Sequence, residues 1–384
     1  MGRAIVHMDL DTFFVSCERL NNSKLNGLPV IIGGGDRGVV ASCSYEARFF
    51  GVRSAMPIKL ALRLCPDAKV IKGDMEMYSR LSHTVTEVIQ EQAPVMEKAS
   101  IDEFYLDVSG LDKFFGCYKW TEELGRSVTR HTGLPISFTL STNKTVAKIG
   151  TGEGKPNGHL HIEENRVKPF LAPLSPQKIP GVGDSTYQLL SRIGVRTIHT
   201  LSEMPMEVLQ QLIGKNGTSL WKKANGIDST PVEPYTERKS ISSEHTFDQD
   251  TIDIKMIRDV ISGMVEKLSF QLRSEQWLTS TVVIKVRYAN FDTETKQCRV
   301  AYTSADHTLS KSALDLFDKL YNRRMRVRLI GVRFTGLVHG SQQIDLFEDT
   351  QEMVSLYQAL DKIKNRFGFA AVGRMAGFEL KSNR

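Results

Sequence analysis

Three carboxylates in apolar settings are the residues of this chain best placed to do chemistry. Asp102 and Glu103 stand side by side between two apolar runs, and Asp9 ends the apolar segment 4–8. An unpaired charge is costly to remove from water, so acids in such places need a compensating partner. Carboxylate oxygens are the ligands that hard cations such as Mg²⁺ prefer. The three acids therefore predict a metal site; the alternative is three unrelated surface acids at the ends of loops.

The spacing of these acids sets a structural demand. Neighbouring residues of a regular strand point to opposite faces, so Asp102 and Glu103 face one site only where strand geometry is broken. Ala99 and Ser100 permit a hairpin turn there, and Asp9 must then lie on an adjacent strand. Two metal ions about 3.5–4 Å apart, held by such acids, would clamp the attacking and leaving oxygens of a phosphoryl transfer.

A second group of side chains is basic or phenolic. Tyr45 and Arg48 lie three residues apart at the expected start of a short helix, and hence on one face of it. Lys155 follows the glycine-rich stretch 150–154. Converging near the acids, these groups would bind a triphosphate, whereas each alone would be an ordinary exposed residue. The glycine-rich stretch is not a P-loop, because Pro156 replaces the serine or threonine that would ligate Mg²⁺.

Two further features suit contacts with nucleic-acid phosphates. Gly181 and Gly183 lie between two short predicted helices, where glycines let backbone N–H groups approach a phosphate; the alternative is a plain tight turn. Residues 322–334 hold several arginines and no acid, which indicates either a surface that follows a phosphate backbone or a solvated face. These arginines are Arg323, Arg324, Arg326, Arg328 and Arg333.

The order of predicted elements in residues 1–164 indicates an α+β domain with helices on one face of a sheet. Asp74 is a suitable N-cap for a long helix that reaches Gln92. The predicted strands are 3–8, 30–32, 39–41, 95–98, 103–108 and 135–140, and the predicted helices begin near residues 12, 57, 74, 118 and 143.

The sequence pattern changes after residue 165. Prolines that recur every few residues, followed by a short amphipathic segment, predict a small helical region, and the polar stretch 229–240 is typical of a linker. From 241 to 338 the order β-α-β-β-α-β predicts a small sheet with two helices on one face. A further helix is expected over 351–366.

Composition is that of an ordinary soluble globular protein, with 41% apolar and 24% charged residues and a net charge of +6. No run of about 18 apolar residues predicts a membrane span, and the first residues lack the apolar core of a signal peptide. Five scattered cysteines, none in C-x-x-C spacing, predict a reduced cytoplasmic protein. A length of 384 residues allows two to four domains.

Taken together, the motifs resemble the Y-family DNA polymerases of the bacterial DinB, or DNA polymerase IV, type over nearly the whole chain. Residues 8–14 (MDLDTFF) resemble the first metal motif of that family, and residues 99–103 (ASIDE) the second. Residues 44–52 (SYEARFFGV) resemble its fingers motif. Residues 143–149 and 155–158 (KPNG) resemble its lysine motif.

The resemblance implies an α+β, multidomain, right-hand polymerase. Its activity would be low-fidelity, template-directed DNA synthesis past lesions, without proofreading, by a cytoplasmic, nucleoid-associated monomer that uses dNTPs on a primer–template. The implied domains are a palm (1–12 and 75–164), small fingers (13–74), a thumb with a helix-hairpin-helix (165–230), a linker (231–240), a βαββαβ little finger (241–338) and a C-terminal tail (339–384).

The same resemblance assigns roles to individual residues. The catalytic residues that would hold two Mg²⁺ ions, together with the Leu10 carbonyl, are Asp9, Asp102 and Glu103. The residues that would bind the incoming dNTP are Phe13, Phe14, Tyr45, Arg48 and Lys155. Phe14 would be the steric gate, because a rigid ring against C2′ of the sugar leaves no room for a hydroxyl. The residues that would contact DNA are Gly181, Gly183, Arg328 and Arg333.

The tail contains a segment that resembles the pentapeptide by which bacterial proteins bind the sliding clamp. In residues 343–347 (QIDLF), Leu346 and Phe347 would fill an apolar pocket and Gln343 would anchor beside it. The alternative is a buried tail strand. For the whole chain, two other functions stay open: a non-catalytic DNA-binding scaffold and a metal-dependent nuclease.

Overall fold

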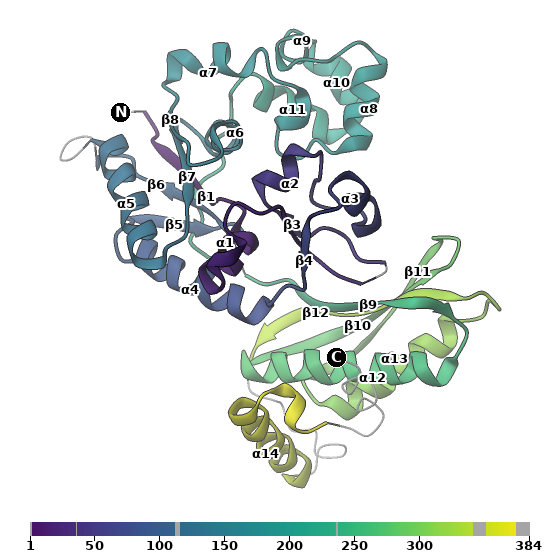
Figure 1. Cartoon of the computed structure of the whole chain (residues 1–384). Coiled ribbons are helices and arrows are strands. Elements are labelled where there is room, and N and C mark those ends of the chain that lie inside the picture. Colours follow the sequence, from purple (N-terminus) through teal and green to yellow (C-terminus); the bar gives the residue numbers. More distant parts are fainter. Residues whose placement is uncertain (1, 36, 112–115, 236, 341–350, 374–384) are drawn as a thin grey trace. The chain divides into compact units, whose positions relative to one another are not determined.

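The computed structural model of this chain has two compact units, Met1–Thr236 and Glu237–Arg384 (Figure 1). Each unit has its own hydrophobic core. The residues that the structure describes are 2–35, 37–111, 116–235, 237–340 and 351–373. Within these ranges, no helix is both long enough and apolar enough to cross a bilayer.

A five-stranded sheet with the order β5-β6-β1-β7-β8 organises the first unit (Figure 1). The central strand β1 runs antiparallel to both neighbours, and Asp9 pairs with Glu103 on one side and with Ser137 on the other. Two predicted acids are therefore cross-strand partners. The strands are β1 (Ile5–Leu10), β5 (Val95–Lys98), β6 (Glu103–Asp107), β7 (Ile136–Ser141) and β8 (His159–His161).

Helices cover both faces of this sheet, so the prediction of helices on one face is wrong. Alternate residues of β1 face opposite sides, and Val6 and Met8 pack in the main core with α4 and α5. On the opposite face α6 packs against β1 and β7. Asp9 faces the side of the sheet that α6 covers, where Lys148 and Lys155 lie. The helices are α1 (Phe13–Asn21), α4 (Met75–Gln90), α5 (Cys117–Thr132) and α6 (Lys144–Gly154).

Local signals in the sequence explain most of these boundaries. The Asp74 carboxylate caps α4 by accepting the N–H groups of Glu76 and Met77, as predicted. The glycine-rich stretch 150–154 is not a loop but the last part of α6. Gly150 is required there, because a Cβ at this position would lie 2.6 Å from the Thr139 side chain on β7. The glycines thus allow α6 to pack closely on the sheet.

A small subdomain follows α1. Its three-stranded sheet has the order β3-β2-β4, and it has its own core around Ile31, Cys43 and Ala47. The predicted strand 39–41 is wrong: the strand lies at Ser42–Cys43, and Val39 makes only an isolated bridge. The elements are β2 (Val30–Ile32), β3 (Ser42–Cys43), α2 (Tyr45–Phe49), α3 (Ile58–Leu64) and β4 (Lys69–Ile71).

The helical region predicted after residue 165 is present. Its short helices share a core of leucines that includes Leu171, Leu190 and Leu209. The next segment is attached to the first unit rather than free, since Asp228 accepts hydrogen bonds from Thr145 on α6 at 2.7 and 3.2 Å. The helices are α7 (Glu164–Leu171), α8 (Asp184–Arg192), α9 (Ile198–Ser202), α10 (Met206–Ile213) and α11 (Lys215–Ala224).

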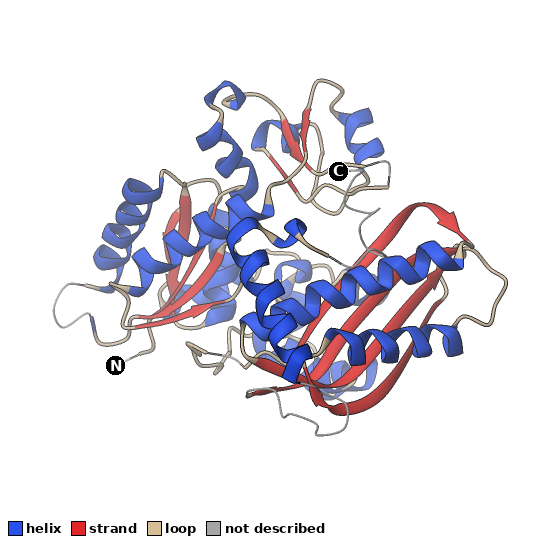
Figure 2. Ribbon diagram, turned by 90° about the horizontal axis from the view of Figure 1, so that it is seen from below, coloured by secondary structure: helices blue, strands red, loops and turns tan. Residues whose placement is uncertain are grey.

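The second unit has the predicted β-α-β-β-α-β order. Its four-stranded sheet has the order β11-β10-β12-β9, and α12 and α13 lie against one face of it (Figure 2). Ile330, Val332 and Phe334 point from β12 into the core beneath these helices. The elements are β9 (Ser240–Thr251), α12 (Ile254–Ser274), β10 (Trp277–Tyr288), β11 (Thr293–Thr303), α13 (Asp306–Leu320) and β12 (Val327–His339).

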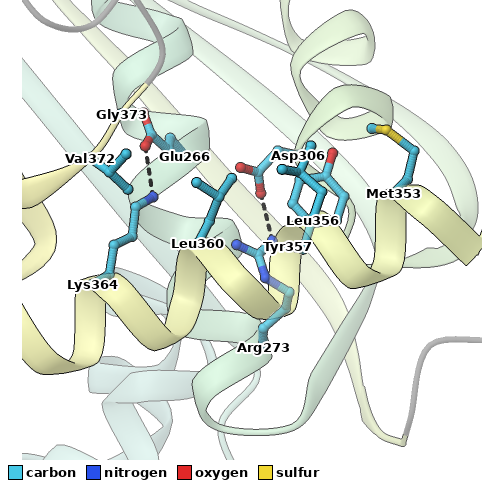
Figure 3. Close-up of a pocket in the computed structure, with 10 residues that line it drawn as sticks. All are labelled: Glu266, Arg273, Asp306, Met353, Leu356, Tyr357, Leu360, Lys364, Val372 and Gly373. Carbon is cyan, nitrogen blue, oxygen red and sulfur yellow. Dashed lines mark hydrogen bonds and ion pairs between the residues drawn. The ribbon is translucent and has the colours of Figure 1, made fainter.

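The helix α14 (Gln351–Phe367) docks on this second unit through charged pairs (Figure 3). The Lys364 ammonium lies 2.7 Å from the Glu266 carboxylate of α12, and both side chains are almost fully buried. Arg273 of α12 pairs with Asp361 of α14 at 2.7 Å and with Asp306 at 2.6 Å. Between these pairs lies a cavity of about 180 Å³ lined largely by apolar side chains of α14.

Candidate active site

A cavity of about 150 Å³ lies at the end of β1 and collects residues from distant parts of the first unit. It is polar in its lining and brings carboxylates, cations and aromatic rings together. The residues that line it are Asp9, Leu10, Thr12, Phe13, Phe14, Ala41, Ser42, Arg48, Ser54, Asp102 and Lys155. Of the residues predicted for metal and nucleotide, only Glu103 and Tyr45 do not line it, and both lie beside residues that do.

The chain breaks strand geometry at the two adjacent acids. The strand β6 begins at Glu103, whereas Asp102 lies in the bend that precedes it. The Ser100 hydroxyl fixes this bend, donating to the Asp102 carboxylate at 2.6 Å and accepting the Glu103 N–H at 3.1 Å. The Leu10 N–H donates to the Asp102 carbonyl at 3.0 Å, which ties the bend to β1.

Two lysines stand against the acids. The Lys155 ammonium pairs with the Asp9 carboxylate, and the Lys148 ammonium lies 2.6 Å from Glu103. Lys148 projects from α6 and was not predicted as a site residue, although it stands in the stretch that resembles a lysine motif. In the described ranges, no group of three His, Cys, Asp or Glu side chains is arranged to hold a metal ion.

The electrostatics of Asp9 test whether a cation fits here. Burial raises the pKa of Asp9 to about 7; the carboxylates of Asp102 and Glu103 add to that rise, and Lys155 opposes it. Buried carboxylates that repel one another indicate that their surroundings supply too little positive charge to stabilise all of them in the ionised form. The three acids, with hard oxygen donors, therefore suit a divalent cation, which would replace the ammonium groups as their partner.

The helix α2 supplies the phenolic and guanidinium groups. Its N-cap is Ser44, whose hydroxyl accepts the Ala47 N–H at 3.2 Å. Arg48 lies over the Tyr45 ring, with its guanidinium carbon 5.2 Å from the ring centroid. Burial and the carboxylate of Asp11 raise the pKa of Tyr45, so its hydroxyl stays protonated at neutral pH and remains a donor.

The two phenylalanines of α1 have different surroundings. Phe13 is 3% exposed and belongs to the core, although its edge reaches the cavity. Phe14 lines the cavity and stacks on Tyr78 of α4, with ring centroids 4.5 Å apart. The Tyr78 hydroxyl donates to the buried carboxylate of Glu18 at 2.6 Å. Tyr78 was not predicted, because its sequence signal is only that of an apolar helix position.

The residues predicted to contact DNA are not among those that line the cavity. Gly183 is the N-cap of α8, and Gly181 has a φ of +100°, which only glycine adopts without strain. Arg333 points from β12 away from the core-facing side chains and is exposed. Arg328 lies at an irregularity of β12, 4.6 Å from the Phe291 ring centroid.

The predicted clamp-binding residues Gln343, Leu346 and Phe347 lie outside the described residues.

Models of known protein families match three parts of this sequence. The impB/mucB/samB family matches residues 8–152, and the C-terminal domain of that family matches residues 238–346. The thumb domain described for DNA polymerase-iota matches residues 177–228. The first match contains every residue of the cavity except Lys155.

Curated relatives align along most or nearly all of the chain. DNA polymerase IV of Dehalococcoides mccartyi is 34% identical over 384 residues, covering 99% of this chain and 98% of the relative. DNA polymerase IV of Desulfatibacillum aliphaticivorans is 36% identical over 379 residues, covering 96% and 95%. That of Exiguobacterium sibiricum is 36% identical over 342 residues, covering 88% and 95%.

Solved structures share the fold. A Y-family DNA polymerase chimera superposes with a TM-score of 0.78 at 24% identity, covering 88% of this chain and 100% of the chimera. DinB from Sulfolobus solfataricus superposes with a TM-score of 0.61 at 25% identity, with the same coverage.

Proposed function

This chain belongs to the Y-family DNA polymerases of the impB/mucB/samB family, and from that membership we propose how its active site works. It is a translesion DNA polymerase, a DNA-directed nucleotidyltransferase that takes primer–template DNA and dNTPs as substrates and depends on a metal. The thumb and the C-terminal little finger are the other recognisable parts of the polymerase.

We propose that the metal is Mg²⁺ and that two ions are bound. The ligands would be the carboxylates of Asp9, Asp102 and Glu103 and the Leu10 carbonyl. The raised pKa of Asp9 supports this, because burial and, to a smaller degree, the carboxylates of Asp102 and Glu103 disfavour its charged form, which a bound cation would stabilise. When bound, the two ions supply an activated primer 3′-hydroxyl and a neutralised leaving pyrophosphate.

The cavity itself carries the proposal. It places Asp9 and Asp102 beside Arg48, Lys155 and the Phe14 ring in one space of about 150 Å³. Guanidinium and ammonium groups bind phosphate oxygens, so Arg48 and Lys155 would hold the triphosphate while the acids face its reacting end. Lys155 would exchange its partner from Asp9 to a phosphate oxygen when a nucleotide enters.

Nucleotide selection would depend on the fixed rings. Phe14 has little freedom to move aside, because it stacks on Tyr78 and Tyr78 is itself held by Glu18. A ring held in this way at C2′ of the sugar would exclude a ribose hydroxyl, which is the steric-gate role. Phe13 would support Phe14 from the core side, since the two ring centroids are 5.6 Å apart.

The remaining assignments extend the same proposal. We place the palm at 1–12 and 75–164, the fingers at 13–74, the thumb at 165–230 and the little finger at 241–338. Gly181, Gly183, Arg328 and Arg333 would contact the template duplex, and residues 343–347 would bind the bacterial sliding clamp. The enzyme would be a nucleoid-associated, cytoplasmic monomer of low fidelity without proofreading.

One assay separates this function from its alternatives. A labelled primer–template is incubated with the protein, Mg²⁺ and dNTPs, and the products are resolved by length. Extension of the primer is the expected result. Shortening would identify a metal-dependent nuclease, and a gel shift without either would identify a DNA-binding scaffold. Asp102→Ala is the control, because it should bind DNA normally and extend nothing.

A further inference from the structure

A fourth acid, Asp11, lies next to the active site but outside the cavity lining. It follows β1 and is 2% exposed. Its carboxylate accepts hydrogen bonds from three separate segments of the chain. The Ser137 hydroxyl of β7 lies 2.8 and 3.0 Å from the two oxygens, the Asn157 N–H lies 2.7 Å away, and the Tyr45 hydroxyl lies 3.3 Å away.

These contacts distinguish Asp11 from the three acids of the cavity. Asp9 and Glu103 have lysines as partners, whereas the donors to Asp11 among the described residues are two hydroxyls and a backbone N–H. Both of its oxygens are engaged by neutral donors from fixed positions, which is the pattern of a carboxylate that orders the chain around it.

One of the ordered segments carries Lys155. The chain leaves α6 at Lys155, and the Asn157 N–H then bonds to Asp11. The Ser137 hydroxyl also accepts the Gly158 N–H at 3.1 Å, so the same serine joins Asp11 to the next residue of the segment. Asp11 therefore sets the direction in which Lys155 enters the cavity, because it holds Asn157, two residues further along the chain.

The other ordered group is the Tyr45 hydroxyl of α2. A phenol carries one proton, so Tyr45 donates either to Asp11 or to a phosphate oxygen, but not fully to both. The distance of 3.3 Å to Asp11 is long for an O–H···O hydrogen bond. Such a bond orients the phenol and gives way readily to a better acceptor.

We propose that Asp11 is a positioning residue for the incoming nucleotide. It fixes the Lys155 segment against β7 and orients the Tyr45 hydroxyl until a phosphate oxygen accepts that hydroxyl's hydrogen bond. Asp11 touches neither the metal nor the substrate, and it acts through these two side chains. This inference rests on the proposed triphosphate site, in which Lys155 and Tyr45 contact the nucleotide.

The test is Asp11→Asn, which keeps the size of the side chain but turns one acceptor into a donor facing other donors. Single-nucleotide insertion kinetics should show KM for the dNTP raised by about tenfold or more, with a smaller change in kcat. The affinity for primer–template, measured without dNTP, should stay unchanged. Asp107→Asn is the matched control, because Asp107 lies on the same sheet opposite Ile5, at the far end of β6.

Two further variants keep the test decisive if Asp11→Asn folds poorly. Ser137→Ala removes the hydroxyl that joins Asp11 to Gly158 and should raise KM for the dNTP in the same direction. Tyr45→Phe removes the hydroxyl that Asp11 orients, so the combined variant Asp11→Asn/Tyr45→Phe should raise KM by less than the product of the single effects.

Unchanged KM in both Asp11→Asn and Ser137→Ala would overturn the role of Asp11. A loss of primer–template affinity that equals the change in KM would overturn it as well, since that is a general structural defect. Lys155→Ala tests the triphosphate site independently. If Lys155→Ala raises KM and the Asp11 and Ser137 variants do not, only the inference fails; if Lys155→Ala also leaves KM unchanged, the proposed triphosphate site fails.

Discussion

Phe14 and Tyr78 stack almost face to face, with ring centroids 4.5 Å apart and planes 15° from parallel. The two rings come from different helices, α1 and α4, and meet beside the cavity that holds Asp9 and Asp102. Tyr78 is fully buried, so Phe14 rests on a ring that has no space to move. The stack is therefore a rigid wall on the side of the cavity where the sugar would lie.

Replacing Phe14 should relax the choice of sugar. Phe14→Ala opens space at C2′, and we expect discrimination between dNTP and rNTP to fall by about tenfold or more, because the loss of a steric wall removes its penalty. The measurement is kcat/KM for insertion of each nucleotide opposite the same template base. Tyr78→Leu should lower discrimination less, since the Phe14 ring remains but loses its support. Unchanged discrimination in Phe14→Ala would show that another group excludes the ribose hydroxyl.

Much of the first unit could be predicted from local sequence. The apolar segment that ends at Asp9 and the cap at Asp74 are signals within a few residues of the structures that they specify. The hairpin turn at Ser100 was likewise predictable, because adjacent acids can share one face only beside such a break. These features depend on neighbouring residues and on general rules of strands and helices.

Contacts between distant segments could not be predicted in this way. Lys148 reaches Glu103 only because α6 packs against β1, and that packing depends on Gly150, which the sequence presents as part of a loop-like stretch. Asp11 and Ser137 are 126 residues apart and meet through sheet register. Ordinary polar residues carry no local mark of such roles, so only the tertiary structure reveals them.

The pKa of Asp9 predicts how metal-free stability depends on pH. Its pKa rises from 3.8 to about 7 on folding, so between these values the folded protein binds a proton that the unfolded chain releases. Stability without metal should therefore fall as pH rises from about 4 to 7, and this contribution should then level off. Thermal unfolding in a chelator across this range measures it. Asp9→Asn should flatten the slope, and a slope unchanged in that variant would assign the proton to another group.

Added Mg²⁺ should oppose this fall in stability with pH, because its stabilising effect should grow as pH rises. The metal binds the ionised carboxylate, so protons compete with it below pH 7. We expect the rise in melting temperature on adding Mg²⁺ to be small near pH 5.5 and larger near pH 8, where Asp9 is ionised. Asp102→Asn, which removes a proposed ligand, should weaken this rise at both pH values. An equal rise at both pH values in the unaltered protein would separate metal binding from the ionisation of Asp9.

The proposed clamp segment is tested by deletion. Removing residues 343–347 should leave unaided primer extension intact, because the cavity residues all lie before residue 156. Stimulation by the bacterial sliding clamp should be lost. The matched control replaces Leu346 and Phe347 by alanine, which removes only the apolar anchors and should have the same result. Clamp stimulation that survives both changes would place the clamp contact elsewhere in the chain.

The buried pair Lys364–Glu266 predicts how firmly α14 is held. Lys364→Met leaves the Glu266 carboxylate without its partner, and breaking a buried ion pair costs about 3–5 kcal/mol when the other charge stays buried. Release of α14 would cost less free energy than this, because it would return the Glu266 carboxylate to water. We therefore expect faster hydrogen exchange in α12 and α14 and a loss of stability below that range.

The double variant Lys364→Met/Glu266→Leu isolates the charge from the docking. Apolar side chains of similar size satisfy the interface without an ion pair, and such replacements are often close to neutral. Exchange in α14 should therefore return to that of the unaltered protein, while Arg273 keeps its pairs with Asp306 and Asp361. If the double variant exchanges as fast as Lys364→Met, the ion pair itself holds α14; if neither variant changes exchange, the Arg273 pairs alone hold it.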